Sequence, residues 1–311
     1  MAVVLRKLSV LLVTLLAASV IVFLVLDVLP GDPAAVALGT GARADTLAAL
    51  RAQMGLDEPL AARFADFVWR LCRGDLGESV AYHVRVADLI GQRIGVTVPL
   101  AAAALTLSTA VGLPLGVWAA SARGRTVDVL VRVGSQIGLA VPSFWAGLLL
   151  VLVFAVRLGW LPAGGFAGWS DPMHAVRALI LPAVALALPQ AAVLARVARG
   201  AVLETLSADY VRTARARGLT QRAALWRHAV PNALGPILTI WGLQLSFLLA
   251  GAVIVESVFA LPGLGELLFH AVGGRDLVVV EDLVVLLVAV VVIVNALVDV
   301  AQSMLDPRLR A

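Results

Sequence analysis

The stretch SVLLVTLLAASVIVFLVL, Ser9–Leu26, contains 18 consecutive residues without a charge. A helix needs about 20 mostly apolar residues to cross the hydrocarbon core of a membrane, so this stretch with its flanks predicts a membrane-crossing helix. Five further uncharged runs follow along the chain: Ile94–Ala122, Val133–Val156, Ala178–Ala195, Ala229–Val255 and Leu283–Val298. We therefore predict an all-α integral membrane protein with six transmembrane helices.

The composition supports this assignment. Of the 311 residues, 61% are hydrophobic and only 14% are charged, whereas soluble domains are about 45–50% apolar and about 25% charged. A soluble fold of this length could not bury so much apolar surface. Prolines within or at the ends of the runs do not argue against helices, because neighbouring groups or water can satisfy the freed carbonyls in a membrane protein. They are Pro99, Pro114, Pro142, Pro182, Pro189 and Pro231.

The first run could be mistaken for a secretion signal, because Arg6 and Lys7 precede it. The apolar region of a signal peptide spans roughly 7–15 residues, and this run is longer. We therefore expect an uncleaved first helix.

Basic residues orient the helices, since cytoplasmic loops carry an excess of arginine and lysine. With the N-terminus inside, the inner segments hold 14 basic residues against four acidic ones, whereas residues 30–93 hold seven arginines against eight acids. Both termini are therefore predicted in the cytoplasm. The sequence then divides into a first transmembrane helix (1–29), an extracytoplasmic segment (30–93) with helices at Leu47–Met54 and Leu60–Leu71, and a five-helix core (94–311) with a cytoplasmic loop at about 200–228.

That loop contains the stretch DYVRTARARG, Asp209–Gly218. Residues 205–217 lack Gly and Pro and are compatible with a helix, and Gly218 stands where a helix end favours a positive φ. Thr220 can cap a second short helix that extends through Trp226 and runs into the next span. Three functions are open for this loop. Its arginines could do no more than orient the chain in the membrane, the loop could contact DNA, or it could dock a partner protein. Its attachment to membrane helices at both ends disfavours nucleic acid, and the small residues Ala214 and Gly218, one turn apart, would let a protein surface approach closely.

Signals for chemistry within the chain are absent from the sequence. Lys7 is the only lysine and lies in Arg6-Lys7-Leu8, so the chain lacks the Gly-Lys-Ser/Thr motif of a phosphate-binding loop. Cys72 is the only cysteine. The histidines have no metal-ligand spacing and are His83, His174, His228 and His270. We predict a non-catalytic chain without a metal site or a cofactor of its own.

Several motifs, in order along the chain, resemble one family. The stretch Tyr210–Leu219 followed by His228–Asn232 is similar to the EAA loop of binding-protein-dependent ABC importers, and more narrowly to the dipeptide/oligopeptide/nickel permeases. Thr213-Ala214-Arg215 stands where the general pattern has Glu-Ala-Ala. The other matching motifs are LPGDPA at Leu29–Ala34, MGLDEPL at Met54–Leu60, GDLGES at Gly74–Ser79, VPSFW at Val141–Trp145, GWLP at Gly159–Pro162, ESVFALPGLG at Glu256–Gly265 and DPRLR at Asp306–Arg310.

The resemblance implies a type I ABC importer permease, specifically the first of two permease subunits, in the bacterial inner membrane. Its implied partners are a second, homologous permease, two ATPase subunits that hold ATP and Mg²⁺, an extracytoplasmic binding protein and membrane lipid. The loop would be the ATPase-coupling element through Asp209, Tyr210, Ala214, Arg215, Gly218 and Leu219, supported by His228 and Asn232. The implied cargo is di- or oligopeptides, with nickel or a metal chelate as the alternative.

Polar residues close to the apolar runs are further candidates, because carboxylates in a membrane usually face a cavity or a partner. Asp27 and Glu256 are predicted near the outer helix ends, within reach of water, whereas Asp299 and Asn295 belong to the last run. Each of these groups could either form a structural hydrogen bond to a neighbouring helix or contact the transported substrate. We predict Glu256, Phe259, Pro262 and Gly263 as possible pathway or gate residues.

Two other classes of function remain open at this point. An ion- or proton-coupled secondary transporter would act alone, but such proteins often show two related halves, and no internal repeat is visible. A membrane anchor for a cytoplasmic complex would have little use for so many helix prolines.

Overall fold

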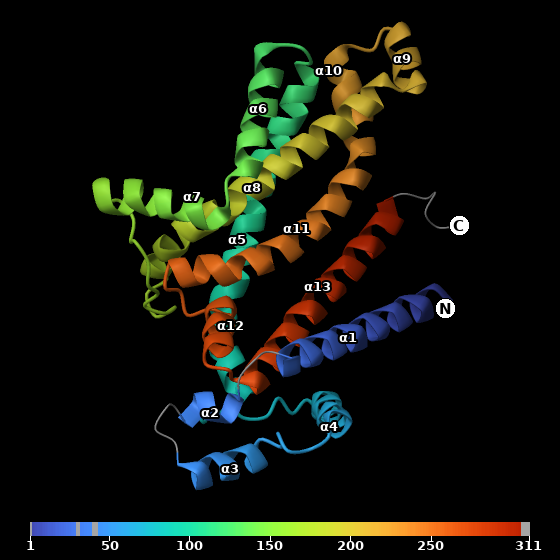
Figure 1. Ribbon diagram of the computed structural model, residues 1–311. Coiled ribbons are helices and arrows are strands. Elements are labelled where there is room, and N and C mark those ends of the chain that lie inside the picture. The colour runs from blue at the N-terminus through green and yellow to red at the C-terminus, as the bar shows by residue number, and fades with distance from the viewer. Residues whose placement is uncertain (1, 29–31, 39–42, 306–311) are drawn as a thin grey trace. The chain divides into compact units, whose positions relative to one another are not determined.

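The computed structural model describes residues 2–28, 32–38 and 43–305 (Figure 1). These residues are helical apart from turns, loops and one isolated antiparallel bridge between Glu78 and Arg85. The elements are α1 Ala2–Val28, α2 Pro33–Leu38, α3 Ala44–Gln53, α4 Leu60–Arg73, α5 Val86–Ser121, α6 Thr126–Ala140, α7 Ser143–Leu150, the π-helix η1 Val151–Arg157, α8 Pro172–Ser207, α9 Asp209–Ala216, α10 Gln221–Ala224, the π-helix η2 Leu225–Ala229, α11 Val230–Val258, α12 Leu264–Gly273 and α13 Leu277–Leu305.

The chain forms two compact units, and the long helices α5 and α13 each contribute to both. The first unit comprises residues 1–96 and 262–293, and the second comprises residues 97–261 and 294–311. The predicted division into segments 1–29, 30–93 and 94–311 concerns sides of the membrane, and it stays a prediction.

Five of the described helical segments are long and apolar enough to cross a membrane: Ser9–Leu26, Val86–Ser121, Pro172–Ser207, Gln221–Val258 and Leu277–Val298. The predicted run Val133–Val156 is not one straight helix, because α6 and the α7–η1 segment meet at an angle of 98°. Pro142 restricts the residue before it to extended backbone, and Val141 has φ −88° and ψ 117°. Six spans result when this bent pair is counted as one.

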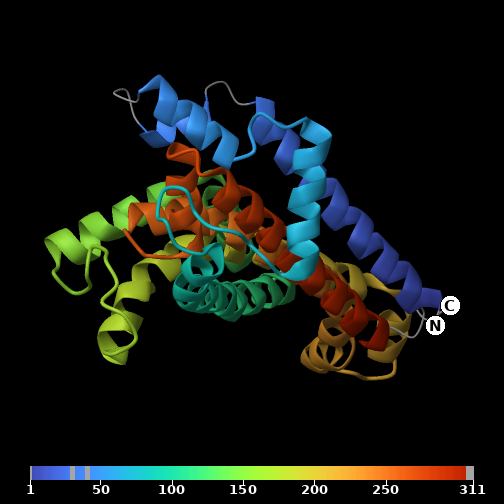
Figure 2. The same cartoon turned by 90° about the horizontal axis from the view of Figure 1, so that it is seen from below.

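In the first unit, α4 lies beside α1 (Figure 2). Phe67 of α4 is 1% exposed and packs near Phe23 of α1 and Phe64. The two outer helices expected at Leu47–Met54 and Leu60–Leu71 are present as α3 and α4. Gly74 ends α4 with a φ of 71°, a conformation that glycine adopts without strain.

In the second unit, α8 is the central helix and contacts α6, α7 and α11. Its buried residues are mostly alanines, and two glycines of α5 let that helix approach the α8 backbone locally. A Cβ on Gly112 would lie 2.6 Å from the Ala191 carbonyl oxygen, and one on Gly116 would lie 2.5 Å from the Ala195 carbonyl oxygen. The spacing of four residues on both helices is that of the small-residue contacts that pack membrane helices.

An ion pair joins α6 to α8 near the end of this unit that carries α9. Arg199 donates to both carboxylate oxygens of Asp128, with a distance of 3.0 Å from Nη2 to Oδ2. The Asp128 side chain is 3% exposed and also accepts the Gly124 backbone N–H at 2.9 Å. A buried carboxylate with these partners fixes the α5–α6 turn against α8.

We predict that Gly116→Ala destabilises the protein by about 1–3 kcal/mol, the usual cost of overpacking, because the added methyl group would also lie 2.8 Å from Ala198 Cβ. Thermal unfolding of the purified protein in detergent measures this change. Gly200→Ala is the matched control, since nothing lies within 4 Å of the position that its methyl group would occupy and alanine is favoured over glycine in a helix by about 0.5–1 kcal/mol. Equal melting temperatures for the two variants would contradict the close α5–α8 packing.

Candidate functional site

The short helix α9 connects two long helices at one end of the second unit (Figure 1). Residues 205–217 are compatible with a helix by composition, but they do not form one continuous helix, because α8 ends at Ser207 and Ala208 is extended, with φ −66° and ψ 144°. The chain therefore turns before α9 begins at Asp209. Val211 is fully buried and anchors the helix, which contacts both α8 and α10.

Gly218 ends α9 in the manner that the sequence predicts. Its φ is 98°, a conformation that L side chains rarely adopt. Its N–H donates to the Arg215 carbonyl at 2.9 Å, and the Leu219 N–H donates to the Ala214 carbonyl at 3.2 Å. These two bonds form a Schellman motif, which satisfies helix-end carbonyls and fixes the direction of the chain that leaves the helix.

Thr220 then caps the next helix, as predicted, by accepting the Ala223 N–H at 3.2 Å. The helix also runs on into the next span, as predicted. It continues from α10 through η2 into α11, so that Gln221–Val258 is one uninterrupted helical segment. Pro231 has no N–H to donate to the carbonyl four residues earlier, and the π-helical turn η2 lies directly before this part of the helix.

Five of the eight predicted coupling residues line one shallow hollow: Tyr210, Ala214, Gly218, Leu219 and His228. The Tyr210 and His228 rings meet edge to face, with centroids 6.3 Å apart and planes at 76°. Thr213 and Arg217 also line the hollow and are absent from our prediction. Both could have been found from their spacing, because positions 210, 213, 214 and 217 share one helix face.

The other three predicted residues surround the hollow without lining it. Asp209 is exposed, and its Oδ1 lies 3.6 Å from Nη1 of Arg212. Arg215 is exposed at the end of α9, where its charge complements the helix dipole. Asn232 donates from Nδ2 to the His228 carbonyl at 2.6 Å and so holds the backbone beneath the His228 ring.

Glu256 is placed differently from the prediction. We expected it within reach of water, but it is fully buried, and its Oε1 accepts a 2.7 Å hydrogen bond from the Thr97 hydroxyl on α5. The expectation considered only its position near the end of an apolar run, whereas the packing of α5 against α11 decides its exposure.

Phe259 follows at the end of α11 and is 1% exposed. Its carbonyl accepts the Gly165 N–H at 2.8 Å, and a Cβ on Gly147 would lie 2.8 Å from its ring. Pro262 and Gly263 belong to the first unit, where Gly263 precedes α12. Asn295 is partly buried in α13. For Asp27 and Asp299 the structure describes the helical backbone but not the side chains.

Within the described part of the chain, no group of three or more His, Cys, Asp or Glu side chains is arranged to hold a metal ion.

Residues 112–311 match the family described as "Binding-protein-dependent transport system inner membrane component", and residues 1–101 match the family of the corresponding N-terminal region.

Relatives match along almost the entire chain. A Brucella abortus (strain 2308) protein, named only provisionally as a peptide transport system permease, is 39% identical over 99% of both chains. The di/tripeptide transport system permease protein DppB of Pseudomonas aeruginosa (strain UCBPP-PA14) is 38% identical over 98% of this chain and 97% of its own. The glutathione transport system permease protein GsiC of Escherichia coli O6:H1 is 38% identical over 99% of this chain and 98% of its own.

The fold is similar to that in an inward-facing structure of the MetNI methionine ABC transporter. The TM-score is 0.58 at 20% identity, with 70% of this chain and 96% of that chain covered. The fold is thus that of a type I ABC importer permease, and membership of a transporter family excludes a mere membrane anchor. The chain belongs to the family of inner membrane components of binding-protein-dependent transport systems, as a multi-pass inner membrane protein.

Proposed function

We propose that this permease imports di- or oligopeptides and that α9 is the helix through which a separate ATPase drives it. A second, homologous permease supplies the other half of the pathway, two ATPase subunits bind ATP and Mg²⁺, and an extracytoplasmic protein delivers the substrate. A secondary transporter that acts without such partners does not fit a family whose members depend on a binding protein.

The observation that carries this proposal is the connection of α9 to the spans. One residue, Ala208, separates α9 from α8, and a hydrogen-bonded turn of four residues leads into the unbroken Gln221–Val258 helix. A docking element must be rigid and firmly joined to the helices that it moves, because packed helices respond to force as rigid bodies. The Schellman motif at the end of α9 and the single residue between α8 and α9 meet these requirements.

The charge of the connection supports a cytoplasmic position. The segment Arg196–His228 holds seven arginines against two acids, and an excess of basic residues marks cytoplasmic loops. With this loop inside, α9 faces the compartment that contains ATP, and both termini are cytoplasmic as well.

The substrate class rests on the relatives. The names of the three relatives above specify peptides, di- and tripeptides, and glutathione. None of these names specifies nickel or another metal, so the nickel alternative has no observation in its favour. Of the four predicted pathway or gate residues, Phe259, Pro262 and Gly263 remain our proposal. For Glu256 we propose a structural role instead, because it is fully buried and bonded to Thr97.

We predict that the tagged chain, extracted from its native membrane in mild detergent, co-purifies with a second permease and an ATPase. ATP hydrolysis by the assembly, reconstituted in liposomes, should rise with the substrate-loaded binding protein, and labelled dipeptide should accumulate. Peptide uptake by liposomes that contain only this chain, without ATP, would overturn the proposal.

Gly218→Val should uncouple ATP hydrolysis from transport or prevent ATPase binding. The reason is conformational, because nothing lies within 4 Å of the Cβ position while a β-branched residue is strained at a φ of 98°. We expect uptake to fall at least 10-fold, measured together with the ATPase stoichiometry of the purified complex.

Gly218→Asn is the matched control for this experiment, since asparagine tolerates positive φ better than valine does. It should keep substantially more uptake than Gly218→Val. If both variants transport like the unaltered protein, the bent end of α9 has no part in coupling.

Glu256→Gln should preserve complex assembly and peptide uptake, because the amide oxygen can still accept the Thr97 hydroxyl. Uptake assays of the reconstituted complex at equal protein level measure the effect. A large loss of uptake in a normally assembled complex would instead show that the carboxylate charge is needed, as a pathway residue requires.

A further inference from the structure

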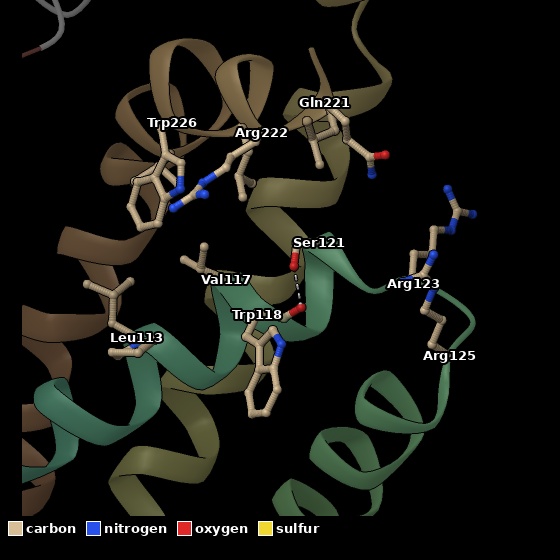
Figure 3. A pocket seen from close by; sticks show the side chains of 13 residues that line it. Leu113, Val117, Trp118, Ser121, Arg123, Arg125, Gln221, Arg222 and Trp226 are labelled. Carbon is tan, nitrogen blue, oxygen red and sulfur yellow. Dashed lines mark hydrogen bonds between the residues drawn. The ribbon is translucent and has the colours of Figure 1, made fainter.

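A second pocket, in the same unit but separate from the hollow at α9, combines an apolar wall with arginines. It has a volume of about 710 Å³ and lies between the end of α5, the end of α8 and the α10–η2–α11 segment. Its apolar side is formed by Leu113, Val117, Leu206, Leu225 and Val230, together with Pro114. In Figure 3, Trp226 and Arg222 project from the α10–η2 segment, whereas Arg123 and Arg125 lie on the turn that follows α5.

The charge at this pocket has one sign. Arg123, Arg125 and Arg222 line it, and no aspartate or glutamate does. All three arginines are exposed, and none of them forms an ion pair within the described part of the chain. Guanidinium groups bind phosphate through paired hydrogen bonds, so the free arginines favour a phosphate-bearing occupant.

The remaining lining indicates a hydrocarbon tail on the same occupant. Leu113 lies eight residues before Ser121 in α5, which corresponds to about 12 Å along the helix. This wall belongs to a span that crosses the membrane. Trp118 and Trp226 are 57% and 56% exposed, and such side chains prefer the boundary between hydrocarbon and water.

We propose that this pocket binds one anionic phospholipid, with its phosphate attracted by the combined positive charge of Arg123, Arg125 and Arg222 and an acyl chain along Leu113 and Val117. A soluble protein segment would match the arginines but not the apolar wall of a membrane span, and a neighbouring transmembrane helix would leave three arginines unpaired. The inference goes beyond the proposed import of peptides and does not depend on the identity of the substrate.

The position of the lipid gives it a structural consequence. Arg222 belongs to α10, which begins three residues after Gly218 and continues into α11. A phosphate in the pocket would attract α10 on one side and the α5–α6 turn on the other, and would so hold both at the membrane surface. The lipid would thereby hold the base of the α9 connection without touching its hollow.

The test is native mass spectrometry of the full-length chain in detergent, titrated with phosphatidylglycerol and, separately, with phosphatidylcholine. We expect one saturable phosphatidylglycerol and no equivalent phosphatidylcholine site. Arg123→Gln/Arg125→Gln/Arg222→Gln should weaken that binding roughly 100-fold, about a factor of five for each arginine near an anionic lipid. Because the chain is used alone, the outcome does not depend on whether an ATPase or second permease associates with it.

Arg212→Gln/Arg215→Gln/Arg227→Gln removes the same charge from the same connection without altering the pocket lining. This control should retain the saturable site. Equal weakening in both triple variants would reduce the effect to general charge attraction and overturn the proposal. A photo-crosslinker in place of Trp226, in native membranes, should capture lipid, and capture of a permease or ATPase subunit instead would assign the pocket to that protein.

Discussion

Close contact between small residues along α8 is the constraint on which the second unit depends. Lipid tails are as apolar as the side chains, so no hydrophobic gain draws helices together inside a membrane, and their association relies on packing and on polar contacts. Gly112 and Gly116 let α5 approach the α8 backbone, and a Cβ on Gly138 of α6 would lie 2.9 Å from Ala192 Cβ. Because α9 begins two residues after α8 ends, this packing also fixes where α9 starts.

Buried polar groups supply the second kind of contact between these helices. The Asp128–Arg199 pair joins α6 to α8, the Thr97–Glu256 bond joins α5 to α11, and Gln244 of α11 donates to the Gln190 carbonyl of α8 at 2.7 Å. A polar group in an apolar interior is costly unless it is paired. Each pair therefore favours one register of its two helices, and a shift along the helix axis would break the bond.

The sequence alone predicted those features that depend on neighbouring residues. Uncharged runs predicted most of the spans, and Gly218 and Thr220 predicted a corner with its two caps. Proline, by contrast, does not predict whether a helix continues or bends. Pro114 and Pro182 lie within α5 and α8, whereas Pro142 lies at a 98° bend. The break at Ala208 has no glycine or proline to announce it, and the burial of Glu256 depends on a helix more than 150 residues away. The burial of Glu256 is therefore a result of tertiary packing, which the local sequence does not contain.

The length of the two connections limits how α9 can act. An extended residue spans at most about 3.6 Å, so the single residue Ala208 permits very little displacement of α9 relative to α8. The turn from Arg217 to Thr220 contains more residues, but the Gly218 and Leu219 N–H groups are bonded to the end of α9 and the Thr220 side chain is bonded to the start of α10. Neither connection therefore lets α9 move far without its neighbouring helices. A partner that shifts α9 by more than a few ångströms must therefore move α8, α11 or both, which makes a short, capped helix more effective for transmitting motion than a long flexible loop.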